Sequence, residues 1–208
     1  MKKIYFVRHG ESEGNVKLIM QGPETLLTER GREQAVAIAE RCAKLPIEAI
    51  VSSSMVRAKQ TAEIIAEKTN KPLEFSDLFV ERRRPKEVSG KHFEDPEVVG
   101  FRRAIRDTAD IDFRFSDEEN FGDLKERAYN ALEFLRNRKE ENILVVTHGL
   151  FLRMIVAYVF FGEQLNGHEI KQLFWKLSHA NTGITVIEFN DKENSWNLRT
   201  WNDHAHLG

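Results

Sequence analysis

The stretch Ile4-Tyr5-Phe6-Val7-Arg8-His9-Gly10-Glu11-Ser12 joins a short apolar run to a polar, glycine-containing turn. Four consecutive apolar, β-prone residues are typical of a strand that is covered on both faces, as the strands of parallel sheets are. We therefore predict a buried strand over residues 4–7. Such a strand would deliver Arg8 and His9 to its carboxyl end, where open α/β sheets bind their ligands.

Segments typical of helices and of strands alternate along the rest of the chain. Apolar residues at helical spacing predict helices over 28–45, 55–69, 119–138 and 150–161. Runs of β-prone residues predict strands over 47–52, 73–75, 143–146, 184–189 and 196–200. We expect Ser53 or Ser54 to cap the helix at 55–69. The alternation predicts an α/β fold, a three-layer α/β/α sandwich with a mainly parallel sheet.

Residues 80–118 differ from this pattern, because they hold two prolines, two glycines and many charged residues with weak periodicity. We expect an irregular insertion with short helices over this range. The whole chain, 1–208, is expected to form a single domain, since its length suits one α/β domain with a modest insertion.

The composition excludes several classes of partner. The formal net charge of -2 creates no field toward nucleic acid or an anionic membrane, so neither partner is expected. The longest apolar segment, 150–161, contains Arg153 and is too short to cross a bilayer. The only cysteine, Cys42, lies on the apolar stripe of a predicted helix, which favours a core thiol. We expect a cytoplasmic protein, and the sequence leaves its oligomeric state open.

Residues that suit a phosphoryl group follow three of the predicted strands. Arg8 and His9 follow the first strand, Arg57 lies in the first turn of the helix after the second, and Thr147-His148-Gly149 follows the strand at 143–146. If these strands are neighbours, the two arginines and two histidines converge on one point. Guanidinium groups and helix N-termini bind phosphate, and an imidazole can attack phosphorus. With positive charge from the arginines and a protonated second histidine, the pattern predicts phosphoryl transfer with no metal and no other cofactor.

These residues resemble the signature of the histidine phosphatase superfamily, the phosphoglycerate-mutase-like group. The matching motifs run from residue 4 to about residue 189. They are Arg8-His9-Gly10-Glu11-Ser12 with Asn15, Leu27-Thr28 with Gly31, the segment from Ser53 to Ala62 with Arg57, Thr147-His148-Gly149 and Asn181-Thr182-Gly183. The resemblance implies a phosphoglycerate-mutase-like fold, in which the insertion at about 80–118 forms a cap over the active site.

The resemblance also implies a role for each matched residue. His9 would be the nucleophile that carries the phosphoryl group, and Arg8, Arg57 and His148 would hold the phosphoryl oxygens. His179 lies outside the motifs and is expected to pack or to face solvent. The remaining members of the implied substrate-binding set are Asn15, Gln21, Gly22 and Gly149.

Two glutamates compete for the role of general acid. A Leu-x-x-Glu match places it at Glu81, but residues 82–90 depart from the glycine-aromatic-Glu-Gly stretch usual at this point in the family. Glu87 therefore competes with Glu81, and we favour Glu81. The basic residues at 82–86 form a solvated loop in the simpler interpretation. In the alternative interpretation they bind a second anionic group of the substrate.

Three functions are compatible with these residues. The leading hypothesis is a phosphatase that hydrolyses a small phosphomonoester through a phosphohistidine. The second is a mutase of the phosphoglycerate type, which uses the same residues, although such mutases tend to carry longer insertions than 208 residues allow. The third is a non-catalytic phospholigand-binding protein. The motif residues argue against it, because a binding protein has no need for a nucleophile such as His9. The small phosphorylated substrate is not identified by the sequence.

Overall fold

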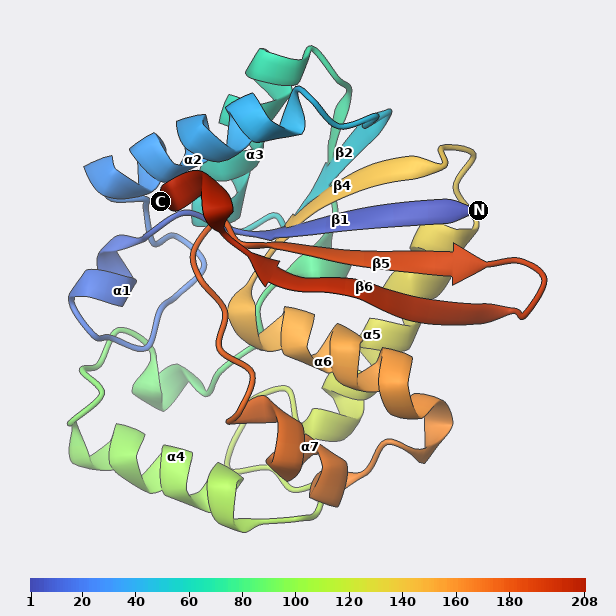
Figure 1. Ribbon diagram of the computed structural model, residues 1–208. Helices are drawn as coiled ribbons and strands as arrows, with labels where there is room; N and C mark the ends of the chain where they lie inside the picture. The colour runs from blue at the N-terminus through green and yellow to red at the C-terminus, as the bar shows by residue number, and fades with distance from the viewer.

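The computed structural model describes residues 1–208, and its centre is one six-stranded sheet in the order β3-β2-β4-β1-β5-β6 (Figure 1). The first four strands in the chain run parallel, β5 is antiparallel to β1, and β6 is antiparallel to β5. The mainly parallel sheet is therefore confirmed. The strands are β1 (Lys2–Arg8), β2 (Ala49–Ser52), β3 (Leu73–Phe75), β4 (Asn142–Thr147), β5 (Ile184–Asn190) and β6 (Ser195–Asp203).

The apolar run at the start of the chain forms a central strand, as predicted. Ile4 and Phe6 face one side of the sheet and Tyr5 and Val7 face the other, because side chains alternate along a strand. β4 lies between β1 and β2 and pairs with both. The carboxyl ends of these three parallel strands therefore lie side by side, which is the condition for the predicted convergence.

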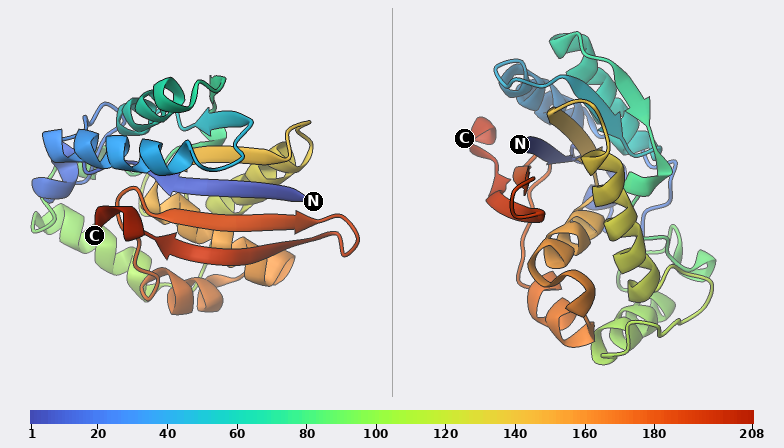
Figure 2. Two further views of the ribbon diagram at one scale, coloured as in Figure 1. Left: turned by 45° about the horizontal axis from the view of Figure 1, so that its top comes forward. Right: turned by 90° about the vertical axis from the view of Figure 1, so that its right-hand side faces the viewer.

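Helices cover both faces of the sheet and complete the predicted three layers (Figure 2). α2 (Glu29–Cys42) and α3 (Val56–Thr69) pack on the face that carries Tyr5 and Val7. α5 (Phe121–Arg136) and α6 (Gly149–Phe161) pack on the face that carries Ile4 and Phe6. None of the helices combines the length and the apolar character that a membrane crossing requires.

The insertion is more regular than predicted. It contains a short 3-10 helix at Lys86–Val88 and the twelve-residue helix α4 (Pro96–Asp107). Asp95 caps α4 by accepting a hydrogen bond from the backbone N–H of Glu97, and a proline at the first helical position is compatible with a helix start. Two short helices, α1 (Glu13–Val16) and α7 (Gly167–Phe174), were also not predicted.

The start of α3 differs from the expected cap. Met55 occupies the N-cap position, so the expectation of Ser53 or Ser54 as the capping residue is wrong. The Ser53 hydroxyl does accept a hydrogen bond from the backbone N–H of Met55, at 3.2 Å, but it also lies 2.8 Å from Nε2 of His148. Ser53 thus joins the start of the helix to the cluster at the strand ends.

Candidate active site

The two histidines of the motifs meet at the carboxyl ends of β1 and β4. Both rings are buried, and their centroids are 5.1 Å apart. The backbone N–H of His9 donates to the carbonyl of Thr147 at 3.0 Å, which ties the two strand ends together. The convergence predicted for the strand ends is confirmed for His9, His148 and Arg57, because Arg57 Nε lies 3.2 Å from Nε2 of His9.

The surroundings of His9 determine which of its ring nitrogens carries the lone pair. Nδ1 lies 2.7 Å from the carbonyl oxygen of Gly10, and because a carbonyl can only accept, Nδ1 carries the proton. The lone pair is then on Nε2, which accepts the hydrogen bond from Arg57 Nε. Nη1 of Arg57 donates to the carbonyl of Gly22 at 3.0 Å, so this guanidinium is held in place at two of its nitrogens.

Two buried polar atoms beside His9 have no partner within the protein. They are Nε of Arg8 and Nδ1 of His148, while Nη1 of Arg8 donates to the carbonyl of His179. A buried donor or acceptor without a partner costs about 1–3 kcal/mol. An anion at this point would give both atoms a partner, which is the arrangement expected of a phosphoryl pocket.

The pocket disfavours the protonated form of both histidines. Burial, reinforced by Arg57 and Arg8, lowers the pKa of His9 well below 6.5. Burial, reinforced by Arg57 and His9, lowers the pKa of His148 in the same way. A neutral imidazole is what a nucleophile requires. The direction of this pKa shift runs against the expected protonated His148, and Arg8 and Arg57 carry the positive charge beside the two rings.

The turn after His9 is held by the start of α2, and this explains two glycines of the motifs. A Cβ atom on Gly10 would lie 2.3 Å from the carbonyl oxygen of Gly31, and one on Gly31 would lie 1.9 Å from that of Glu11. Thr28 caps α2 by accepting from the N–H of Gly31 at 2.9 Å and bonds Glu11 Oε1 at 2.8 Å. The two backbones approach so closely that only glycine fits.

Glu81 lies at the N-terminus of α6. Its Oε1 accepts the backbone N–H of Phe151 at 3.0 Å, and its Oε2 accepts that of Leu150 at 3.2 Å. It is close enough to Arg8 and Arg57 to act on their pKa values, which burial lowers and the Glu81 charge raises. The structure thus brings Glu81 to the histidine cluster.

Glu87, the competing candidate for the general acid, points elsewhere. It is exposed, and its Oε1 accepts a hydrogen bond from the hydroxyl of Ser116 at 2.7 Å. No contact joins Glu87 to the arginines that surround His9, so the geometry favours Glu81.

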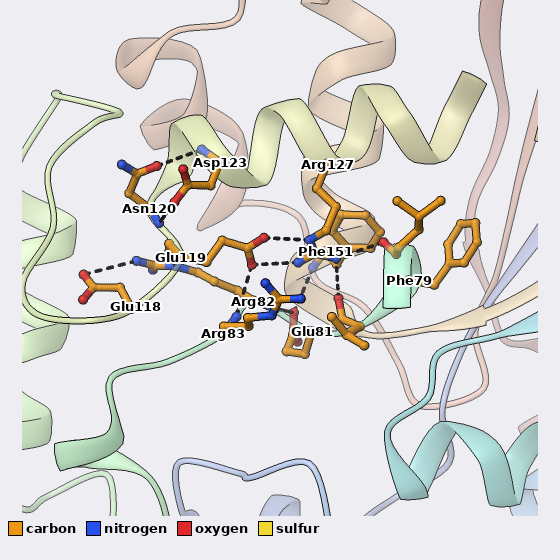
Figure 3. Close-up of polar contacts among 12 residues, drawn as sticks. Phe79, Glu81, Arg82, Arg83, Glu118, Glu119, Asn120, Asp123, Arg127 and Phe151 are labelled. Atoms are coloured by element: carbon orange, nitrogen blue, oxygen red, sulfur yellow. Dashed lines mark hydrogen bonds and ion pairs between the residues drawn. The ribbon is translucent and has the colours of Figure 1, made fainter. Parts of the chain in front are cut away.

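A buried ion pair holds the segment that carries Glu81 (Figure 3). Nε and Nη2 of Arg127, on α5, donate to the two carboxylate oxygens of Glu119 at 2.6 and 2.7 Å. Nη1 of Arg127 also donates to the carbonyl of Val80 at 2.8 Å, and Glu119 accepts the backbone N–H of Arg83 at 3.1 Å. The residues on both sides of Glu81 are therefore fixed by one pair. Nothing in the sequence pattern pointed to Glu119 or Arg127.

The predicted substrate-binding residues lie around the same point. The hydroxyl of Ser12 is 2.8 Å from the side-chain oxygens of both Asn15 and Gln21. The carbonyl of Gly22 accepts from Arg57, and a Cβ atom on Gly149 would lie 3.3 Å from Arg8 Nε. Asn15 and Gln21 thus support the turn after β1, and Gly149 leaves room for Arg8.

A cavity of about 430 Å³ opens next to Glu81. It reaches from the loop of Gln21 and Gly22 to the basic segment after Glu81, and its lining includes Gln21, Gly22, Met55, Glu81, Arg83 and Arg84. Its size suits a small ligand. A second cavity, of about 450 Å³, lies between Arg114 and Arg127 and is lined by none of the predicted site residues.

Two further residues near the cluster had a weak signal or none in the sequence. Arg153 was noticed only as a charge inside an apolar helix, yet it lies near Arg8 and donates to the carbonyl of Phe174 at 3.1 Å. His179 is buried against Trp201, with 5.0 Å between ring centroids, and burial lowers its pKa to about 3. The expectation that His179 packs is thus met. No group of three or more histidine, cysteine, aspartate or glutamate side chains could hold a metal ion.

Comparison with known proteins agrees with this geometry. The family model described as "Histidine phosphatase superfamily (branch 1)" matches residues 4–204. The chain is 32% identical over 214 residues to a metal-independent phosphoserine phosphatase of Arabidopsis thaliana, covering 99% of this chain and 83% of that protein. It is 29% identical over 219 residues to the probable phosphoglycerate mutase GpmB of Salmonella arizonae, and the match covers 100% of this chain and 95% of that protein. The structure of a mycobacterial glucosyl-3-phosphoglycerate phosphatase in complex with VO3 superposes on this chain with a TM-score of 0.80 at 25% identity. The superposition covers 98% of this chain and 100% of that chain.

Proposed function

The chain belongs to branch 1 of the histidine phosphatase superfamily, and from this premise we propose that it hydrolyses a small phosphomonoester through a phosphohistidine on His9. The observation that carries the proposal is the state of His9. Its ring is neutral, its Nδ1 is bonded to the Gly10 carbonyl, and its Nε2 lone pair faces the guanidinium of Arg57. A phosphoryl group bound by Arg57 would lie in front of that lone pair.

The first step forms the phosphoenzyme. Nε2 of His9 attacks phosphorus, the N–P bond forms, and the ester P–O bond breaks. Arg8, Arg57 and His148 hold the phosphoryl oxygens, and the unpartnered Arg8 Nε and His148 Nδ1 support this role. Glu81, as a carboxylic acid, gives its proton to the departing alcohol oxygen. Fixed guanidinium groups stabilise the charge that develops on the phosphoryl oxygens.

The second step releases phosphate. Glu81, now a carboxylate, takes a proton from a water molecule that attacks phosphorus, and the N–P bond breaks to regenerate neutral His9. The cavity beside Glu81 supports access of water to this point. The contrast between Glu81, which is near the arginines, and Glu87, which is bonded to Ser116, supports Glu81 as the acid and base.

We propose that no metal and no other cofactor takes part, because Arg8 and Arg57 supply the positive charge that metal ions supply in other phosphoryl-transfer enzymes. The relative described as metal-independent is in keeping with this proposal. Residues 80–118 would serve as a cap within a single domain, 1–208. The backbone bonds of Met20 to Lys91 (2.9 Å) and of Gly90 to Met20 (2.7 Å) support this, since they join the segment to the loop of Gln21.

A mutase is the second candidate, supported by the likeness to a probable phosphoglycerate mutase at 29% identity. The two functions differ in the acceptor of the phosphoryl group, which is water for a phosphatase and an alcohol for a mutase. Incubation of the protein with labelled phosphomonoesters separates them, because a phosphatase releases inorganic phosphate and a mutase forms an isomeric ester. Isomer formation without release of phosphate would replace the proposed function with the mutase.

Trapping of the intermediate tests His9. We expect an acid quench and an alkaline quench to show a label that is labile in acid and stable in alkali, as a phosphoimidazole is. His9→Ala should retain no label. An acid-stable label, or undiminished turnover by His9→Ala, would contradict the proposal.

Leaving-group dependence tests Glu81. We expect Glu81→Gln to slow the hydrolysis of alkyl esters by about 10²–10⁴-fold, the usual contribution of a positioned proton donor, and to slow an activated aryl ester less. Glu87→Gln is the matched control. A silent Glu81→Gln together with a selective defect in Glu87→Gln would move the assignment to Glu87.

A further inference from the structure

Thr182 has a backbone conformation that is rare for its residue type. Its φ is 56°, in the left-handed region, and its side chain is buried. The other non-glycine residues with positive φ are one leucine and three asparagines, so Thr182 is the only β-branched one. A β-branched residue persists in this region only where its surroundings hold it there, and strained residues of this kind concentrate at functional sites.

The turn at 179–183, which contains Thr182, contacts both motif residues at the end of β1. The side-chain amide of Asn181 donates to the carbonyl of His9 at 2.9 Å. The backbone N–H of Thr182 donates to the carbonyl of Arg8 at 2.9 Å, and Nη1 of Arg8 donates to the carbonyl of His179. This turn therefore fixes the backbone of the candidate nucleophile and the side chain of the neighbouring arginine at the same time.

The conformation of Thr182 decides whether these contacts form together. Thr182 lies between Asn181, which bonds His9, and Gly183, whose carbonyl accepts the backbone N–H of Arg8 at 3.4 Å. The φ and ψ angles are the only soft torsions of a residue's backbone, so those of Thr182 set the orientation of one neighbour relative to the other. A change to the ordinary region of φ would separate the two sets of contacts.

His206 contacts Thr182 from the side opposite to β1. The Thr182 hydroxyl oxygen is 2.7 Å from the carbonyl oxygen of Asn181 and 3.0 Å from Nε2 of His206. A carbonyl can only accept, so the hydroxyl gives its one proton to Asn181 and accepts the N–H of His206. Nε2 of His206 therefore carries a proton, and Nδ1 of the same ring is buried without a partner in the protein. The ring thus serves as a donor to one hydroxyl.

The segment that carries His206 is anchored on α2, beside which it lies in Figure 1. Oδ1 of Asp203 accepts from Nη1 of Arg41 at 3.0 Å, and Oδ2 accepts from Nη2 of the same arginine. The side chain of Asn202 accepts the backbone N–H of Ala180 at 2.8 Å. The turn at 179–183 is therefore held between the end of β1 and a segment that is itself fixed to a helix of the core.

We propose that Thr182 and His206 are positioning residues for phosphoryl transfer at His9, and that the hydrogen bond between them keeps the turn in the conformation that aligns His9 and Arg8. The inference rests on the proposed function, in which His9 is the nucleophile. The polar contacts of the two side chains are confined to each other and to the carbonyl of Asn181. Their effect therefore reaches the reaction through the turn.

Loss of this hydrogen bond should affect the chemical step more than the binding of substrate. Arg57 is held by the carbonyl of Gly22, and His148 by the hydroxyl of Ser53, all outside the turn. A phosphoryl group would still meet these two residues after the turn has moved. The attack of His9 depends on its alignment, and a misplacement of about 1 Å can cost about 10²-fold in rate.

Quenched-flow labelling of His9 with phenyl phosphate labelled at phosphorus tests the inference. We expect His206→Leu to slow formation of the label, and kcat, by about ten- to a hundred-fold, and to change KM by less than about threefold. His206→Gln should recover part of the rate, because its amide still donates to Thr182. The matched control is His204→Leu, since His204 is exposed and its Nδ1 lies 2.8 Å from the carbonyl oxygen of Asn202; its rate should be that of the wild type.

A double-mutant cycle separates positioning from a general loss of stability. Thr182→Val removes the hydroxyl, and Thr182→Ser keeps it and should keep the wild-type rate. We expect Thr182→Val/His206→Leu to be no slower than the slower single variant, because both changes remove the same hydrogen bond. Thermal unfolding verifies that each variant is folded at the assay temperature. A wild-type rate in His206→Leu, additive losses in the cycle, or a loss that His206→Gln does not recover overturns the inference.

Failure of the inference is distinguishable from failure of the proposed function. The wild type alone tests the function, because absence of label on its His9 overturns the phosphohistidine mechanism. NMR tests the turn without turnover. His206→Leu should shift the side-chain amide resonances of Asn181, and should leave those of Asn120, which donates to the carbonyl of Asp112 at 3.0 Å, in place. Unshifted Asn181 resonances overturn the inference whatever the reaction is.

Discussion

The buried pair of Glu119 and Arg127 offers a sharp test of how the Glu81 segment is held. The two side chains are 5% and 10% exposed, and they share two hydrogen bonds of 2.6 and 2.7 Å. Glu119→Gln keeps the shape and removes the charge, so the guanidinium of Arg127 stays buried without its counter-ion. Breaking a buried pair from one side typically costs about 3–5 kcal/mol of unfolding free energy.

We expect the loss for Glu119→Gln to lie near 3 kcal/mol, because the amide oxygen still accepts one hydrogen bond and Arg127 still donates to the carbonyl of Val80. Urea unfolding followed by circular dichroism measures it as a shift in the midpoint at constant slope. The double variant Glu119→Gln/Arg127→Met should be less destabilised than the sum of the single variants, since it leaves no unpaired charge.

An exposed pair provides the control. Glu13 and Lys17 lie 2.9 Å apart, with side chains 45% and 63% exposed. Glu13→Gln should cost no more than about 1 kcal/mol, as surface pairs do. Equal losses for Glu119→Gln and Glu13→Gln would refute the reasoning, because they would show that water screens the Glu119 pair as fully as the surface one.

The same pair should affect the reaction as a positioning element. Glu119 and Arg127 hold the backbone of Val80 and Arg83 on the two sides of Glu81. We therefore expect Glu119→Gln to lower kcat for alkyl esters more than for an activated aryl ester, the selectivity proposed for Glu81→Gln. An equal loss on both esters would assign Glu119 a purely structural role.

Three further outcomes are expected. Because the folded-state pKa values of His9 and His148 are well below 6.5, the unfolded chain binds more protons at lower pH, so the unfolding free energy should fall as the pH drops below about 6.5 and stay level above it. Urea titrations should show a weaker dependence in His148→Gln, and an equal slope would contradict this. Gly31→Ala should lower the melting temperature by several degrees, as overpacking costs about 1–3 kcal/mol. Gly100→Ala, in open space within α4, should not lower it. Excess chelator should leave phosphate release unchanged, and restoration of lost activity by one divalent ion would sink the metal-independent mechanism.

Local patterns in the sequence were sufficient to predict the central strands of the sheet and the turns that follow them. The apolar run 4–7 and the run at 143–146 identified two central strands, because full burial of both faces leaves a continuous apolar signature. The glycine after His9 and the one after His148 marked the turns at which these strands end. Parallel strands end at one edge of a sheet, so the meeting of His9, Arg57 and His148 could be predicted on the condition that their strands are neighbours. The strand order of the sheet, with β4 between β1 and β2, supplied that condition.

Only the tertiary structure decided which polar groups pair across the chain. Glu81 is bonded to Phe151 and Glu87 to Ser116, and neither partner is marked by spacing or periodicity. Periodicity reports which face of a helix is apolar, so it could not reveal that Arg127 on α5 lies inside with Glu119. Partners of buried charges are set by burial and distance between segments far apart in sequence, because a low-dielectric interior makes each unpaired charge costly.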